Sequence, residues 1–260
     1  MGSLIEVVDD DAVRFLTLNR PDRLNALNSS VLEELLRCVE TAGADLGVGC
    51  VVIRGAGDRA FCAGADLGEI RGLSAEEAHA FIRRGQRAMT AVESARMPVI
   101  AAVDGFALGG GFELMLACHL AVSSDRSTFG LPEATIGCMP GFGGTQRLLT
   151  TTGKAGAFHL MLTGESIDAE RAWQIGLLSV PPIAAGELPD RVAGLAHRVA
   201  SGSRGGMSKI LEAGRRAALP TALEHEAALA ALAIASLDGQ EGITAFAERR
   251  PPKFERSTGR

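Results

Sequence analysis

The chain of 260 residues has a formal net charge of −5, and 47% of its residues are hydrophobic. This composition is ordinary for a globular protein, and the length allows a core that needs neither disulfides nor a metal. Aromatic residues make up only 4%, and no dense block of lysine and arginine occurs, which argues against a nucleic-acid-binding surface. The five cysteines form no CxxC pair and stand among apolar or small residues, which predicts buried, reduced thiols.

The N-terminal segment MGSLIEVVDDDAVRFLTLNR has neither the basic start nor the apolar stretch of a secretory signal. No apolar run reaches membrane-spanning length without charges. We therefore expect a soluble, cytoplasmic protein. Because aromatic rings are scarce, we expect its core to consist of alanine, leucine, valine and isoleucine.

Strands and helices alternate in the pattern of the first hundred residues. Four apolar runs predict strands, the first two of them joined as a hairpin by an acidic turn: 4–8, 13–18, 50–57 and 99–103. The helix that follows the hairpin has three candidate N-caps: Asn28, Ser29 and Ser30. A second helix, over 74–94, begins with the capping-box pattern SAEE.

Glycine clusters precede three predicted helices, near residues 64, 110 and 141. The repeated order of strand, glycine loop and helix predicts an α/β fold with parallel strands and crossover helices. From about residue 190 onward the sequence is typical of helices, with an Ala-rich stretch long enough to be buried against another subunit. We therefore expect a core that contains the site over 1–190 and a helical oligomerisation region over 191–260.

Three glycines, Gly109 to Gly111, stand directly before a predicted helix. The first amides of a helix have no partner within it and lie at its positive end, and glycine lets an oxygen approach them without meeting a Cβ. One interpretation is therefore a cradle for an anion or a developing negative charge. The other, equally supported by the residues alone, is close packing of helix against strand. The spacing fits neither a Walker A loop nor a GxGxxG motif.

Two glutamates stand in apolar surroundings near these glycine loops. Glu113 follows the three glycines in a helix that is apolar almost all round, and Glu133 precedes the third glycine cluster. A first-turn glutamate by itself is often explained by the helix dipole. A buried carboxylate, however, is costly unless it has a partner or a function. Together the two indicate general acid–base chemistry on a substrate whose oxygen becomes negative.

Several segments resemble the enoyl-CoA hydratase/isomerase (crotonase) family, and the similarity runs nearly from end to end. The segments are NRPDRLNAL (19–27), AFCAGADL (60–67), ALGGGFEL (107–114), GLPEATIGCMPGFGGTQRL (130–148), LTGESIDAERAWQIGLLS (162–179) and GQEGITAFAERRPPKF (239–254). The resemblance implies a spiral of ββα units followed by a C-terminal helical region that forms trimers, commonly paired as hexamers. It also implies acyl-CoA thioester substrates and no further cofactor or metal, since coenzyme A is part of the substrate.

The resemblance also implies roles for particular residues. The amides of Ala65 and Gly110 match the two donors that hold the thioester oxygen as an enolate. Contacts to the adenine fall on Ala63, Asp66 and Leu67. Coenzyme A would also contact three further positions, of which the last would reach its phosphates: Arg23, Leu24 and Lys253.

Hydratases of this family have a glutamate at both positions that match Glu113 and Glu133, whereas many isomerases keep only the second. The resemblance therefore implies syn hydration of a trans-2-enoyl-CoA, with Glu113 as base toward water, Glu133 as acid toward C2, and Gly141 helping to position the water. Two alternatives stay open: a Δ3,Δ2-enoyl-CoA isomerase that needs only Glu133, and a CoA- or RNA-binding relative without activity. His119 stands where the family usually has aspartate, and we interpret it as structural.

Overall fold

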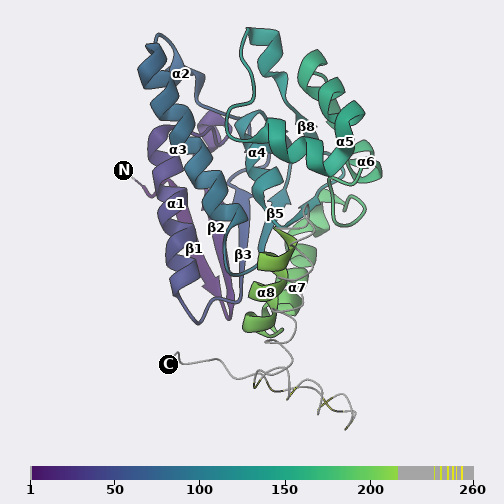
Figure 1. The fold of residues 1–260 in the computed structure, drawn as a ribbon. Coiled ribbons are helices and arrows are strands. Elements are labelled where there is room, and N and C mark those ends of the chain that lie inside the picture. Colours follow the sequence, from purple (N-terminus) through teal and green to yellow (C-terminus); the bar gives the residue numbers. More distant parts are fainter. Residues whose placement is uncertain are drawn as a thin grey trace.

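The computed structural model describes residues 2–215 and, beyond them, positions 237, 241, 245, 248, 250 and 253. Strands and helices alternate along the chain and form two sheets with helices packed around them (Figure 1). The expected α/β class is confirmed. Among the described residues, no helix is long and apolar enough to cross a membrane.

The larger sheet has five strands in the order β1-β2-β3-β5-β7. The strands are β1 (Ile5–Asp10), β2 (Val13–Leu18), β3 (Cys50–Gly55), β5 (Val99–Val103) and β7 (Leu120–Ser123). β1 and β2 form the expected antiparallel hairpin, closed by the pair Asp10 and Val13. The other neighbours are parallel, as the alternation of strands and helices predicted.

The smaller sheet has the order β4-β6-β8-β9. Its strands are β4 (Ala60–Cys62), β6 (Phe106–Leu108), β8 (Thr128–Gly130) and β9 (Ser166–Asp168). β4, β6 and β8 each follow directly after a strand of the larger sheet, and each precedes a helical segment. The chain thus repeats a ββα unit, and glycine-containing loops lie between β4 and α2, between β6 and α4, and between η2 and α5. Strand β9, which pairs antiparallel with β8, was not predicted because it has only three residues.

The α-helices are α1 (Ser29–Ala44), α2 (Leu67–Ile70), α3 (Ala75–Glu93), α4 (Gly110–Ala117), α5 (Gly144–Thr163), α6 (Ala169–Gln174), α7 (Leu188–Ala200) and α8 (Arg204–Gly214). Short 3-10 helices are η1 (Pro21–Arg23), η2 (Pro132–Ile136) and η3 (Ala185–Glu187). Asn28 caps α1 by accepting a hydrogen bond from the amide of Val31. Ser74 and Glu77 form the predicted capping box of α3. These local signals place both helices as the sequence indicated.

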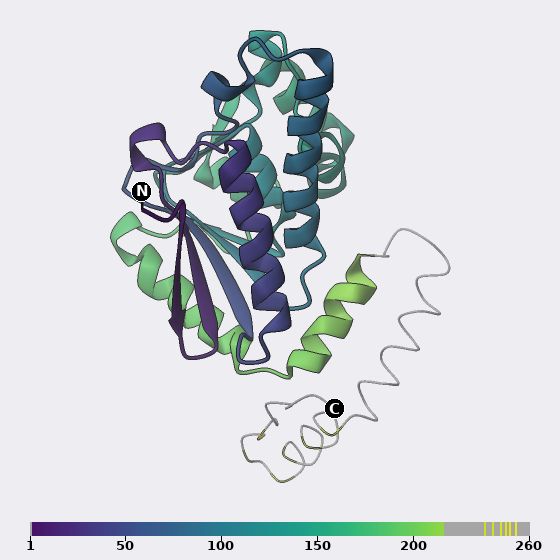
Figure 2. The same cartoon turned by 90° about the vertical axis from the view of Figure 1, so that its left-hand side faces the viewer.

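Apart from its largely exposed edge strand β1, the larger sheet is buried on both faces. Leu16 and Ile53 point toward α1, α3 and α4 in the main core, whereas Phe15 and Val52 point toward α7 on the other face. In Figure 2, α1 and α3 lie on the near side of the sheet, and α7 lies on the other side. The expectation of a purely aliphatic core is wrong, because several phenylalanines are fully buried within it: Phe61, Phe112 and Phe129.

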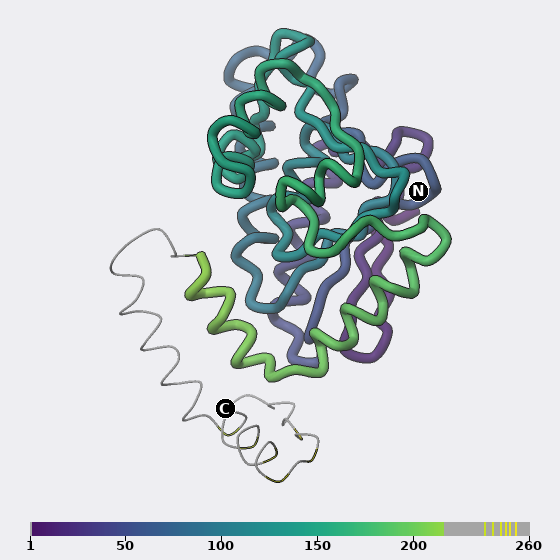
Figure 3. Tube along the Cα trace, turned by 90° about the vertical axis from the view of Figure 1, so that its right-hand side faces the viewer, coloured from purple at the N-terminus to yellow at the C-terminus, as the bar shows by residue number. Residues whose placement is uncertain are grey.

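Helices α7 and α8 run in different directions. α7 packs against β2, β3 and β5, and it spans the boundary expected at residue 190. α8 begins after a short turn, so that the two helices diverge like the arms of a V (Figure 3). Most of the expected oligomerisation region lies outside the described residues.

The cysteines are less uniform than expected. Cys50 and Cys62 are buried and Cys38 and Cys118 are half-buried, but Cys138 is exposed. The prediction of a buried thiol is wrong at Cys138, because the apolar residues around it belong to a surface turn after η2.

Helix α3 contacts the loop before α5 at a glycine. A Cβ at Gly85 would lie 2.1 Å from Cδ1 of Phe142, whose ring also packs against Phe81 at 5.7 Å between centroids. We expect Gly85→Ala to lower the free energy of unfolding by about 1–3 kcal/mol, as overpacking of a core does. Denaturant unfolding would measure the change.

The matched control is Gly194→Ala in α7, where an added Cβ would meet nothing within 4 Å. This change should stabilise the protein by about 0.5–1 kcal/mol, because alanine favours helix more than glycine does. Equal effects of the two substitutions would contradict the role given to Gly85.

Candidate active site

The amide of Ala65 is left without a partner by the way its loop is held. Leu27 donates to the carbonyl of Gly64 at 2.8 Å and accepts from the amide of Asp66 at 2.9 Å. These two bonds make a parallel bridge between Leu27 and Ala65. Successive peptide groups of an extended chain face opposite sides, so the N–H of Ala65 points away from Leu27. No described residue accepts a hydrogen bond from it.

Gly110 supplies a second free amide beside the first. It is the first residue of α4, where an N–H has no partner within the helix. A Cβ added to Gly110 would lie only 3.4 Å from the nitrogen of Ala65. The structure therefore brings together the two loops that sequence reasoning assigned to one oxygen, from segments 45 residues apart in the chain.

The three glycines before α4 have different tasks. Gly109 has φ 50° and ψ −127°, a backbone conformation that favours glycine, and its Cβ would lie 2.9 Å from Oε1 of Glu133. Gly110 keeps the space beside Ala65 open. Gly111 packs against β4, since its Cβ would lie 2.1 Å from the carbonyl oxygen of Cys62. Close packing, one of the two interpretations of the cluster, thus applies to Gly111, whereas Gly110 has the unpaired amide that the other interpretation requires.

Glu113 is buried, with 1% of its surface exposed. Its Oε1 accepts hydrogen bonds from the amides of Phe142, at 2.8 Å, and Gly144, at 2.7 Å. Both donors belong to the third glycine cluster, so the anion held by this cluster is a carboxylate of the protein itself. Oε2 of Glu113 accepts no hydrogen bond from a described residue, which leaves it free for a water molecule.

Glu133 lies in η2 with its carboxylate turned toward α4. Its Oε2 is buried and has no hydrogen-bond partner among the described residues. Its Oε1 occupies the space that a side chain at residue 109 would need. Two carboxyl groups therefore lie near the start of α4: that of Glu113, anchored through one oxygen, and that of Glu133, whose Oε2 has no partner among the described residues.

Burial is the main cause that raises the pKa of both carboxyl groups. The pKa of Glu113 rises to about 7, chiefly by desolvation and also through the charge of Glu133, while the amides of Gly144 and Phe142 and the charge of Arg147 act in the opposite direction. Burial likewise raises the pKa of Glu133. Because the two groups interact, their titration belongs to the pair.

Gly141 begins the loop that holds Glu113. Its carbonyl oxygen accepts a hydrogen bond from Nε2 of Gln86 at 3.0 Å, and a Cβ at this position would lie 2.5 Å from Cδ1 of Ile82. Gly141 therefore lies close to α3, one residue from the amide that binds Glu113. Its role in positioning water stays a prediction.

The residues expected to bind coenzyme A converge from two loops. The amide of Ala63 donates to the carbonyl of Leu24 at 3.0 Å, which joins the loop after η1 to the loop after β4. Leu24 has φ 50° at the end of η1. Arg23 is close enough to Asp66 for its charge to lower the pKa of that carboxyl group, and Leu67 is exposed.

Sequence reasoning missed two residues that hold these loops. Arg20 forms an ion pair with Asp66 at 2.8 Å and is the main cause that lowers the pKa of Asp66. Asn25 is buried and donates from Nδ2 to the carbonyls of Ala56 and Ala60. Both stand in the quoted segment NRPDRLNAL, but their partners are distant in sequence, so no local pattern identifies them.

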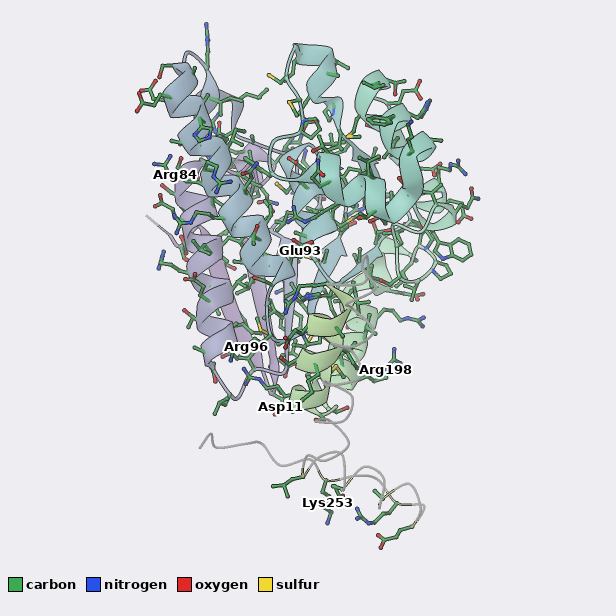
Figure 4. All side chains as sticks on the ribbon, viewed as in Figure 1. Asp11, Arg84, Glu93, Arg96, Arg198 and Lys253 are labelled. Atoms are coloured by element: carbon green, nitrogen blue, oxygen red, sulfur yellow. The ribbon has the colours of Figure 1, made fainter. Side chains whose placement is uncertain are left out.

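Lys253 lies far from the other residues that are predicted to bind coenzyme A. Its amide donates to Oε1 of Glu241 at 2.7 Å, and Figure 4 shows Lys253 beyond the ends of α7 and α8, well away from α4. A contact with the phosphates therefore stays a prediction that this structure does not support.

His119 has structural contacts, as interpreted from the sequence. Its Nδ1 accepts from the amide of Val99 at 3.0 Å, so the proton is on Nε2, which faces the carbonyl of Glu93 at 3.2 Å. Burial lowers the pKa of the imidazole. In the part of the chain that the structure describes, no group of three or more His, Cys, Asp or Glu residues is arranged to hold a metal ion.

The raised pKa of Glu113 predicts how a neutral replacement changes stability with pH. The stability that this raised pKa contributes is complete below the unfolded value of 4.5 and is lost as pH rises through about 7. The rise in the pKa of Glu113 corresponds to a loss of about 3 kcal/mol in the free energy of unfolding at high pH, at about 1.36 kcal/mol for each pKa unit. Glu113→Gln keeps an oxygen for the two amides and avoids the buried charge. We expect it to raise Tm by several degrees at pH 8.5 and much less at pH 5.5.

Thermal unfolding at both pH values measures this difference, with Glu187→Gln on the exposed 3-10 helix η3 as the surface control. A gain that is the same at the two pH values would show that the buried charge is not its origin.

Comparison with known proteins identifies the family of this chain. A family model described as enoyl-CoA hydratase/isomerase matches residues 9–257. A crotonyl-CoA hydratase of Syntrophomonas wolfei is 38% identical over 94% of this chain and 95% of its own, and a 2,3-dehydroadipyl-CoA hydratase of Escherichia coli is 39% identical over 98% and 99%. The crystal structure of an enoyl-CoA hydratase from Bacillus anthracis superposes with a TM-score of 0.93 at 34% identity, covering 98% of this chain and 100% of that one. The chain therefore belongs to the enoyl-CoA hydratase/isomerase family and has its crotonase-like fold.

Proposed function

We propose that this protein is an enoyl-CoA hydratase, which adds water across the 2,3 double bond of a trans-2-enoyl-CoA to give a 3-hydroxyacyl-CoA. The observation on which the proposal rests is the meeting of two unpaired amides, Ala65 and Gly110, with the buried carboxyl group of Glu113 and the half-buried one of Glu133 at the start of α4. The names of the relatives support hydration as the reaction class.

The two amides would hold the thioester oxygen. When water adds to C3, electrons move onto this oxygen and form an enolate, whose negative charge the amides and the positive end of α4 stabilise. One such donor typically contributes about 2.7–4 kcal/mol to lowering the barrier. The donors are fixed before the reaction, since Ala65 is held by its bridge to Leu27 and Gly110 by its place in the helix.

The two carboxyl groups would move the protons. Oε2 of Glu113 accepts a proton from water as the oxygen of that water bonds to C3, and Glu133 gives its proton to C2 as the enolate collapses. The net result is one added water, with the proton transferred from Glu133 to Glu113 and returned before the next turnover. The raised pKa values of both groups suit a pair that shares one proton. Because the two groups titrate as a pair, the roles of base and acid could also be assigned the other way round.

The acyl group is left open. The two relatives compared above are named for different acyl groups, crotonyl and 2,3-dehydroadipyl, at nearly equal identity to this chain. We therefore propose only the substrate class, an acyl-CoA thioester, with no further cofactor. From the family resemblance we also propose a homotrimer or homohexamer as the assembly. A panel of enoyl-CoA thioesters that differ in length and branching would identify the preferred one.

Hydration of an enoyl-CoA is measured by the loss of its ultraviolet absorbance. We expect Glu113→Gln and Glu133→Gln each to lower kcat by roughly 10²–10⁴-fold, the usual contribution of a positioned proton-transfer group, with a smaller change in KM. A rate like that of the wild type in either variant would reject this assignment.

The isomerase alternative is tested with the same variants. A Δ3,Δ2-isomerase needs only Glu133, so Glu113→Gln would keep its rate with a 3-enoyl-CoA. Isomerisation without hydration by the wild-type protein, with the isomerisation rate retained in Glu113→Gln, would establish the alternative. A non-catalytic relative would show neither reaction in the wild type.

A further inference from the structure

A single peptide group links Glu113 to a side chain on α3. The carbonyl of Gly141 accepts a hydrogen bond from Nε2 of Gln86 at 3.0 Å, and the amide of the same peptide group, that of Phe142, donates to Oε1 of Glu113 at 2.8 Å. A trans peptide group is planar, with its C=O and N–H pointing in opposite directions. Holding the carbonyl therefore fixes the direction of the amide that binds the carboxylate.

Gln86 is itself oriented by a charge. Its Oε1 accepts from Nη1 of Arg83 at 2.7 Å, which leaves the NH2 end of its side chain to face Gly141. Arg83, the amide of Gln86, the peptide group and Glu113 form a chain in which every donor points toward the carboxylate. Aligned hydrogen bonds polarise one another, so this chain favours the ionised form of Glu113.

The next carbonyl of the loop is held in the same way from α5. Nη1 of Arg147 donates to the carbonyl of Phe142 at 3.0 Å, and Nη2 pairs with Oε2 of Glu93 at 2.7 Å. Glu93 is the last residue of α3, and its label stands near the centre of the view in Figure 4. Gly143 has φ 110°, and a Cβ there would lie 2.2 Å from Nη1 of Arg147. Glycine at 143 thus makes room for the guanidinium.

We propose that Gln86 is a positioning residue for Glu113, which it orients through the peptide group between Gly141 and Phe142, with Arg147 supporting the neighbouring carbonyl. The proposal rests on the proposed function in that Glu113 is the group that activates water. The carbonyls of the loop face side chains from α3 and α5, and the amides of Phe142 and Gly144 face Glu113. The charged groups that act on Glu113 are Glu133 from η2 and Arg147 from α5.

The test in solution compares two glutamines near the same loop. Gln86→Leu removes the donor to Gly141 but keeps the size of the side chain, and Gln86→Glu keeps the acceptor for Arg83 while removing that donor. We expect both to lower kcat about tenfold, to leave KM within about threefold, and to shift the lower limb of the pH–rate profile to higher pH. The control is Gln146→Leu on α5, whose exposed side chain donates only to Thr145 and should change nothing.

A double-mutant cycle distinguishes positioning from a general structural effect. In the Glu113→Gln background, Gln86→Leu should have no further effect on the residual rate. An equal loss in both backgrounds, or a tenfold loss without a change in the pH–rate profile, would overturn the proposal.

A readout without turnover keeps this test separate from the proposed function. If Gln86 favours the charged form of Glu113, the gain in Tm from Glu113→Gln at pH 8.5 should be larger in the Gln86→Leu background than in the wild type. An unchanged gain would reject the positioning role. Absence of hydration by the wild-type protein with every enoyl-CoA in the panel would instead reject the proposed function.

Discussion

The site depends on a carboxylate that is buried and held through only one of its oxygens. Two amides donate to Oε1 of Glu113, and they offset part of the cost of removing its charge from water. The second oxygen is left for the reaction. If both oxygens were paired, Glu113 would be a structural anion, and if neither were, the protonated form would dominate near neutral pH. The arrangement of the loop at 141–144 follows from this requirement.

Glycine is needed at this site for geometric reasons that differ from residue to residue. Gly110 leaves space between two donors, Gly111 lets α4 approach β4, and Gly85 accommodates the ring of Phe142. Phe142 connects these places, because its amide binds Glu113 and a Cβ at Gly110 would meet its ring at 2.9 Å. The donors and the acid are thus packed against each other, and a shift of the ring would move both.

Much of this could be predicted from the sequence where a local pattern determines the structure. The caps at Asn28 and Ser74 and the apolar runs of the larger sheet located their elements. Glu113 and Glu133 were singled out because a glutamate among apolar residues contradicts ordinary patterning, and the structure shows that Glu113 is buried. What sequence reasoning could not supply were the partners: Arg20 with Asp66, and Gln86 with Gly141. Such pairs join segments about 50 residues apart, and no periodicity records them.

The second and third glycine clusters resemble each other in sequence but differ in what their amides bind. A glycine loop before a helix predicts a site for an anion, but it does not say which anion. At Gly110 the amide stays unpaired and is available to a substrate, whereas at Gly144 the amide is already occupied by Glu113. The difference arises because Glu113 extends from α4 toward the start of α5, so one helix supplies the anion for the next. Two helix starts with similar sequences therefore differ in what their amides bind: in the proposed mechanism the first would hold charge that develops on the substrate, whereas the second holds the carboxylate of Glu113.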